Sequence, residues 1–196
     1  MTGLLRHAAY VVFAMMLWAL SAMAGDDSPP PFFASRAQFV EMRPLAGFGT
    51  FPMTRPDGRK IDLSAFAGRV VLVNFWASWC APCVAELPAL ARVQQEFSAE
   101  GLQVAAVSID AMSKAALGAF LHRVGANNLA VYFNPAARPG SPDIMPARIG
   151  PFRLHALPIS YLIDRRGRVI GFFPGAAAWD SAEGKAFLRH YLKRRS

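Results

Sequence analysis

The segment from residue 70 to residue 97 constrains the fold most, because a strand pattern passes directly into a helix pattern with two cysteines at the junction. Residues 70–76 are apolar except for Asn74, which predicts a central strand covered on both faces. From Cys83 onward, apolar residues recur at spacings of three and four, which predicts a helix whose buried face holds Leu87, Leu90, Val93 and Phe97. The opposite, polar face is assigned to Glu86, Arg92, Gln95 and Glu96.

The two cysteines of this junction have the spacing of a redox-active pair. Pro82 lies in the first helical turn, where its missing N–H removes no helical hydrogen bond. The Cys80 sulfur is therefore expected beside unpaired backbone N–H groups and the positive end of the helix dipole. Free cysteine is only about 3% ionised at pH 7, and this environment lowers the thiol pKa. We predict Cys80 as the nucleophile and Cys83 as the thiol that resolves a mixed disulfide.

Three other uses of the cysteine pair have to be weighed. A structural disulfide closing so short a loop contributes only about 2 kcal/mol, which makes a staple a weak explanation. A zinc site needs two more ligands, and no two of the histidines are close in sequence; they are His7, His122, His155 and His190. Copper is the main alternative, because two thiolates and one imidazole suit it, and His155 is the candidate third ligand.

Two stretches resemble the thioredoxin superfamily, and most closely its TlpA-like and ResA-like periplasmic thiol-disulfide oxidoreductases. The first is NFWASWCAPC at residues 74–83, followed by Glu86 and Pro88, and the second is ALPISYLIDRRGRVIGFFPG at residues 156–175. The resemblance implies an α/β thioredoxin fold with a central mixed β-sheet flanked by helices. It also implies an N-terminal β-hairpin extension, which the turn signal Pro56-Asp57-Gly58 supports.

The resemblance further implies a set of site residues beside Cys80 and Cys83. A cis Leu157–Pro158 bond would expose backbone for an extended substrate, so we expect substrate-binding residues at Trp79, Pro82, Leu157 and Pro158. Many thioredoxins carry a buried aspartate where this chain has Asn74, and an amide cannot carry a proton. We therefore predict that Glu86 exchanges the proton of the resolving thiol, provided that burial raises its pKa.

The amino end predicts an export signal ahead of the domain. Arg6 and His7 precede an apolar run, and Ala22-Met23-Ala24 fits a cleavage site, so we predict a signal peptide at 1–24. An uncleaved membrane anchor is the alternative. A tether and N-terminal extension are expected over 25–45, and a thioredoxin-like domain over 46–193. The expected location is the periplasm, with a membrane tether as the alternative form.

Charge and composition narrow the partners. The chain carries a formal net charge of +8, but its basic residues are scattered rather than gathered in a stripe, so we expect no nucleic-acid partner. The resemblance implies client proteins with disulfides, a membrane thiol relay as electron donor, and no cofactor. It favours reduction of clients such as apocytochrome c or respiratory oxidase subunits over oxidation or isomerisation. A copper chaperone and a redox-inactive scaffold remain as alternative classes of function.

The stretch from Asn134 to His155 is longer than the loop expected between the middle strand and the cis-proline. Its apolar residues could form a partner-binding lip or pack onto the domain; they are Ile144, Met145, Ile149 and Phe152.

Overall fold

The structure is a computed structural model that describes residues 28–34, 37–42, 50–110, 112–138 and 148–194. The predicted signal segment lies outside these ranges, as do Ile144 and Met145 of the long loop. Within the described ranges, no helix combines the length and the apolar character that crossing a membrane requires.

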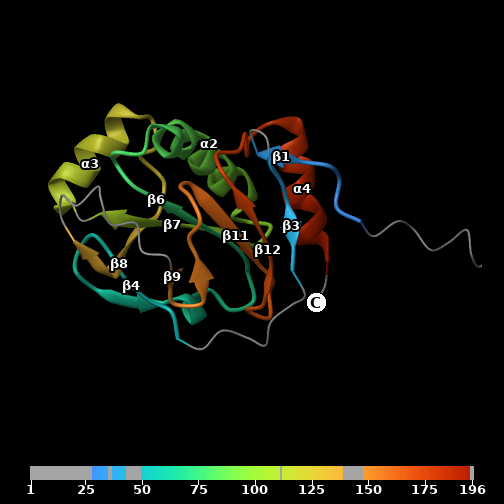
Figure 1. The fold of residues 1–196 in the computed structure, drawn as a ribbon, viewed down its shortest axis with the longest axis horizontal. Coiled ribbons are helices and arrows are strands. Elements are labelled where there is room, and N and C mark those ends of the chain that lie inside the picture. The colour runs from blue at the N-terminus through green and yellow to red at the C-terminus, as the bar shows by residue number, and fades with distance from the viewer. Residues whose placement is uncertain (1–27, 35–36, 43–49, 111, 139–147, 195–196) are drawn as a thin grey trace, which may run out of the picture.

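An eight-stranded mixed sheet forms the centre of the molecule (Figure 1). Its strands, in spatial order, are β3 (Val40–Glu41), β12 (Val169–Pro174), β11 (Ile159–Ile163), β6 (Val70–Trp76), β7 (Leu102–Asp110), β8 (Val131–Arg138), β4 (Pro52–Thr54) and β5 (Lys60–Asp62). Strand β6 runs parallel to β7, and β7 runs parallel to β8, whereas β11 is antiparallel to both β6 and β12. The predicted mixed sheet is confirmed, as is the hairpin β4–β5 that precedes its central strand.

Helices flank this sheet, and two small hairpins lie outside it (Figure 1). The helical elements are η1 (Leu63–Phe66), α2 (Ala81–Phe97), α3 (Lys114–Arg123) and α4 (Ala182–Lys193), and the hairpins pair β1 (Phe33–Ala34) with β2 (Ala37–Gln38) and β9 (Arg148–Ile149) with β10 (Phe152–Arg153). Ser113 and Ser181 cap α3 and α4, because their hydroxyls accept hydrogen bonds from backbone N–H groups of the first turn.

Strand β6, helix α2 and strand β7 form the predicted crossover unit. Two parallel neighbours joined by a helix end at the same side of the sheet, where ligand chemistry collects in open α/β folds. The register pairs Trp76 with Ser108, so the loop after β6 and the last residues of β7 lie beside each other. This unit therefore places Cys80, at the start of α2, next to the carboxyl end of β7.

Strand β6 is buried along its whole length, as its composition predicts. Because successive strand residues point to opposite faces, Asn74 and Phe75 meet different layers. Asn74 bonds to a side chain of α2, whereas the Phe75 ring lies against Phe51 and Phe152. The apolar residues of the long loop thus pack down where the structure describes them: Phe152 is 0% exposed and Ile149 is buried.

Phe32 and Phe39, which precede the hairpin β4–β5 in sequence, pack against β12 and α4. Phe32 packs on Phe173, and Phe39 packs on both Phe173 and Phe187 of α4. Strand β3 pairs with β12 beside them, and a Cβ at Gly171 would lie only 2.4 Å from the Phe39 ring and from a backbone oxygen of β3. Gly171 therefore makes room for this extension of the sheet.

Candidate active site

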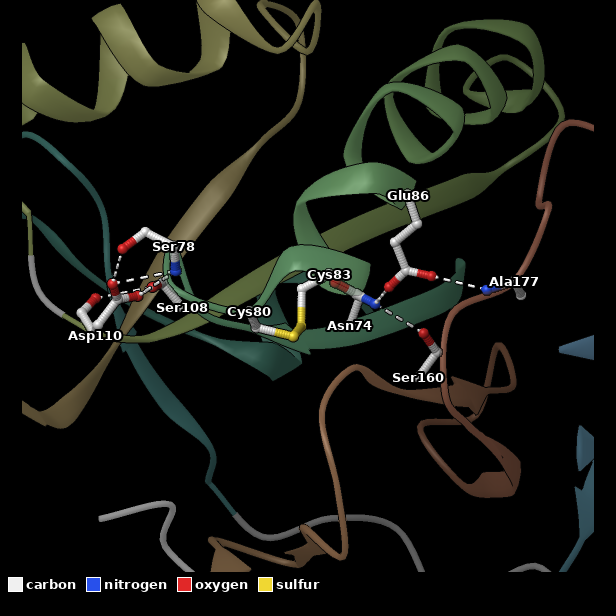
Figure 2. Close-up of a disulfide and its surroundings, with 9 residues drawn as sticks. All are labelled: Asn74, Ser78, Cys80, Cys83, Glu86, Ser108, Asp110, Ser160 and Ala177. Carbon is white, nitrogen blue, oxygen red and sulfur yellow. Dashed lines mark hydrogen bonds between the residues drawn. A yellow bond between two sulfur atoms is a disulfide. The ribbon is translucent and has the colours of Figure 1, made fainter. Parts of the chain in front are cut away.

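Cys80 and Cys83 form a disulfide at the start of α2 (Figure 2). Cys80 is the N-cap residue, and its side chain makes no capping hydrogen bond to the helix. Pro82 lies in the first turn and is exposed. Cys80 is 7% exposed and Cys83 is 0% exposed, so any attack from outside reaches Cys80 first. The predicted placement of both sulfurs and their order of accessibility are confirmed.

The surroundings of Cys80 include an exposed ring and a cis-proline. Trp79, directly before Cys80, is 43% exposed, whereas tryptophan side chains are highly buried on average. The predicted cis bond between Leu157 and Pro158 is present. Ile159 pairs with Phe75 across the antiparallel ladder, so Pro158 lies level with the end of β6, where the loop to Cys80 begins. These residues therefore share one side of the molecule with the disulfide.

Glu86 is buried, which corrects its assignment to the polar face of the helix. Only 4% of the residue is exposed, whereas Arg92, Gln95 and Glu96 are exposed as predicted. The segment after β12 covers this part of α2, and its Ala177 N–H donates to Glu86 Oε2 at 3.0 Å. Asn74 Nδ2 donates to Glu86 Oε1 at 2.6 Å. The helical periodicity could not show that a segment 91 residues away covers this position.

Burial raises the pKa of Glu86 from 4.5 to about 7, because the ionised carboxylate loses its hydration. The hydrogen bonds from Ala177 and Asn74 lower the pKa, but by less than burial raises it. The nearby indole of Trp179 also lowers the pKa of Glu86. Its Nε1, however, has no partner in hydrogen-bond geometry among the described residues. Glu86 can therefore both hold and release a proton near neutral pH. Proton exchange with Cys83 was predicted on the condition that burial raises the pKa of Glu86, and that condition is met.

Asn74 connects Glu86 to a third strand. Its Nδ2 also donates to Ser160 Oγ at 2.9 Å, so β6, α2 and β11 meet in one polar cluster (Figure 2). Among the described residues, Asn74 Oδ1 has no hydrogen-bond partner. If the amide turned over, that oxygen could accept a hydrogen bond from protonated Glu86, so the cluster accommodates both protonation states.

A second buried carboxylate, which the sequence analysis did not identify, lies on the other side of the disulfide (Figure 2). Asp110 ends β7 and is 6% exposed. It accepts hydrogen bonds from the N–H and hydroxyl of Ser78, two residues before Cys80, and from Ser108 Oγ at 2.6 Å. The sequence signal for Asp110 was its place at the end of a buried strand that is parallel to β6, since the carboxyl ends of the two strands meet.

The proposed copper ligand His155 is exposed, and its ring centroid lies 6.3 Å from that of Phe172. Within the part of the chain that the structure describes, no group of three or more His, Cys, Asp or Glu side chains is arranged to hold a metal ion. Binding of copper by Cys80, Cys83 and His155 stays a prediction.

Comparison with known proteins finds a matching family model and similar thiol-disulfide oxidoreductases. The AhpC/TSA family model matches residues 48–172. The thiol-disulfide oxidoreductase ResA of Bacillus thuringiensis (strain Al Hakam) is 30% identical over 180 residues, which is 92% of each chain. ResA of Bacillus subtilis (strain 168) is 30% identical over 125 residues, which is 64% of each chain. A solved structure proposed to be the thiol:disulfide interchange protein DsbE of Chlorobium tepidum has a TM-score of 0.58 at 30% identity, covering 76% of this chain and 99% of its own.

Proposed function

Since the chain belongs to the AhpC/TSA family of thioredoxin-like proteins and is a thiol-disulfide oxidoreductase, we propose that it is exported and reduces selected client disulfides through Cys80 and Cys83. The observation that carries this proposal is the disulfide at the N-terminus of α2, in which Cys80 is 7% exposed and Cys83 is 0% exposed.

The reaction begins with the Cys80 thiolate. It attacks one sulfur of the client disulfide, so a mixed disulfide forms and the other client sulfur leaves as a thiolate. Cys83 loses its proton and attacks the Cys80 sulfur, which releases the second client sulfur as a thiolate and leaves the Cys80–Cys83 disulfide. The client gains two electrons and the protein loses two. A membrane thiol relay would supply the two electrons that restore the dithiol.

Glu86 would take the proton of Cys83 in the second step. The two residues are three positions apart on α2, which places them on neighbouring turns of one helix face. A pKa of about 7 supports this role, because a group half ionised at neutral pH can accept a proton and return it. Glu86 would then pass the proton to the departing client thiolate.

The client would dock beside Cys80. The exposed ring of Trp79 offers apolar contact, Pro82 is exposed in the first helical turn, and the backbone at Leu157 precedes the cis-proline. An extended client segment can pair with that backbone while its disulfide approaches Cys80. Cytochrome c maturation or respiratory oxidase assembly supplies clients of this kind, and the signal-like residues 1–24 support the periplasm as the place of action.

Trapping tests the proposal directly. In Cys83→Ser the second step is blocked, so we expect covalent client adducts that reducing agent releases. The control is the double variant Cys80→Ser and Cys83→Ser, which has no nucleophilic sulfur. The proposal fails if Cys83→Ser, expressed in the host with its residues 1–24 intact, gives the same adduct pattern as this control.

A further inference from the structure

The carboxylate of Asp110 joins two segments that are distant in sequence. It belongs to the end of β7, and its partners Ser78 N and Ser78 Oγ belong to the turn between β6 and α2. Both carboxylate oxygens lie 3.2 Å from Ser78 N. Ser108, which is fully buried, has one hydroxyl hydrogen to donate, and its Oγ lies 2.6 Å from Asp110 Oδ1 and 2.8 Å from the Asp110 carbonyl oxygen, so this contact also orients the carboxylate.

The anchored turn is the one that delivers Cys80. Only residues 77–79 separate the end of β6 from the N-cap of α2, and Cys80 N donates to Ala77 O at 3.2 Å. Ala77 is 0% exposed and Trp79 is 43% exposed, so the turn is buried where it leaves β6 and exposed to solvent just before Cys80. The Asp110 contact to Ser78 lies between them and fixes how the turn leaves the sheet.

A carboxylate suits this task better than a neutral group. It accepts several hydrogen bonds at once, and bonds to a charged acceptor are stronger than neutral ones. Burying such a group is costly unless its oxygens are bonded, so the three donors are needed for the fold to keep it there. A carboxylate also binds a turn at the other end of the sheet, where Asp164 Oδ1 accepts from Arg166 N and Arg168 N at 2.9 Å and Asp164 in addition forms an ion pair with Arg168. That turn carries no cysteine.

We propose that Asp110 is a positioning residue for the dithiol reaction: through Ser78 it holds Cys80 at the helix N-terminus and keeps Trp79 turned outward. This inference rests on the reaction proposed above. It assigns to Asp110 no contact with the substrate and no proton transfer.

The test measures how fast iodoacetamide alkylates Cys80 at pH 7 in a Cys83→Ser background. Asp110→Ala releases the turn, so the thiolate loses its alignment with the helix N-terminus and alkylation slows about tenfold. Asp110→Asn retains one acceptor oxygen, so its alkylation rate lies between those of wild type and Asp110→Ala. Asp164→Ala, the matched control, alkylates at the wild-type rate. With both cysteines present, Asp110→Ala also raises KM for a protein disulfide such as insulin, because Trp79 is displaced.

Two results would overturn the proposal. If both Asp110 variants alkylate faster than wild type by the same factor, the carboxylate acts only through its charge. If Asp110→Ala reacts like Asp164→Ala, the contact has no role in the reaction. Should Asp110→Ala fail to fold by circular dichroism, Ser78→Ala decides: slowing of about threefold supports the proposal, and a wild-type rate refutes it. Alkylation does not depend on the client, so failure of the client-trapping experiment leaves this test intact.

Discussion

At the end of the sheet that carries the disulfide, Glu86 and Asp110 are buried and accept hydrogen bonds from neutral donors, whereas at the opposite end Asp164 is ion-paired and the partly buried Arg165 donates to backbone carbonyls. There Asp164 forms an ion pair with Arg168 at 2.6 Å. Arg165 donates to the carbonyls of Gly68, Glu100 and Leu192. Paired and hydrated charges contribute modestly to stability and respond little to their surroundings. Burial raises the pKa of Glu86 to about 7, and Asp110 is bonded to the turn that carries Cys80, so we expect changes at the first end to alter the chemistry and changes at the second to alter only stability.

The largest expected effect tests whether the disulfide end carries the reaction at all. Cys80→Ser replaces a thiolate with a hydroxyl that is not ionised at neutral pH, so we expect disulfide reduction to fall at least about 1,000-fold. Insulin reduction with a dithiol donor measures it. Retention of most of the activity would point to a redox-inactive scaffold instead, and Cys83→Ser provides the comparison in which the first step survives.

Glu86→Gln tests the effect of burial on stability. In the wild type, the folded state keeps a proton up to about pH 7 that the unfolded state loses near pH 4.5. The free energy of unfolding therefore falls as pH rises through this window, by up to about 3 kcal/mol, and the fall is complete above the folded pKa. Urea unfolding of the oxidised protein at pH 4 and pH 8 should show a smaller fall in Glu86→Gln.

The same variant tests the proton transfer proposed for Glu86. An amide cannot accept the proton of Cys83, so we expect turnover to slow about fivefold and its pH dependence to shift. Glu96→Gln is the matched control, since Glu96 lies on the exposed face of the same helix and pairs with Lys185 and Arg189. An unchanged pH profile in Glu86→Gln would remove Glu86 from the mechanism.

Arg165→Ala tests the opposite end of the sheet. The change removes hydrogen bonds to three carbonyls, so we expect the free energy of unfolding to fall by about 1 to 2 kcal/mol. Disulfide reduction by the folded variant should stay within about twofold of wild type, because nothing near Cys80 changes. A larger loss of activity at a temperature where the variant is folded would break the contrast between the two ends.

Trp79→Ala separates docking from folding. The ring is largely outside the core, so stability should change little, whereas KM for a protein disulfide should rise about threefold or more. Alkylation of Cys80 by a small reagent should stay near the wild-type rate. Unfolding at lower urea with an unchanged KM would instead make Trp79 a packing residue.

His155→Ala gives the smallest expected effect and tests the copper alternative. His155 is exposed and its ring faces Phe172, so we expect disulfide reduction to remain within about twofold of wild type. Competition titration with a Cu(I) chelator measures the other function. A large loss of Cu(I) affinity in this variant would favour a copper chaperone.

Local sequence was sufficient for the elements that carry the cysteines. The apolar run of residues 70–76, the spacing of the apolar residues after Cys83 and the position of Pro82 each act within a few residues, and the structure confirms the strand, the helix and the junction. The cis bond at Pro158 followed from a resemblance rather than from local physics. Glu86 was placed on the wrong face because periodicity reports only which side of a helix is mostly apolar.

The sequence by itself determined that two thiols lie at a strand-to-helix junction, because strand and helix patterns and the first-turn proline are short-range properties of the chain. Only the tertiary structure decided what surrounds them. Ala177 is 91 residues from Glu86 and Asp110 is 32 residues from Ser78 in sequence, yet each pair is hydrogen-bonded. Such contacts depend on strand order, register and the paths of the loops, and these are fixed only when the whole core packs together.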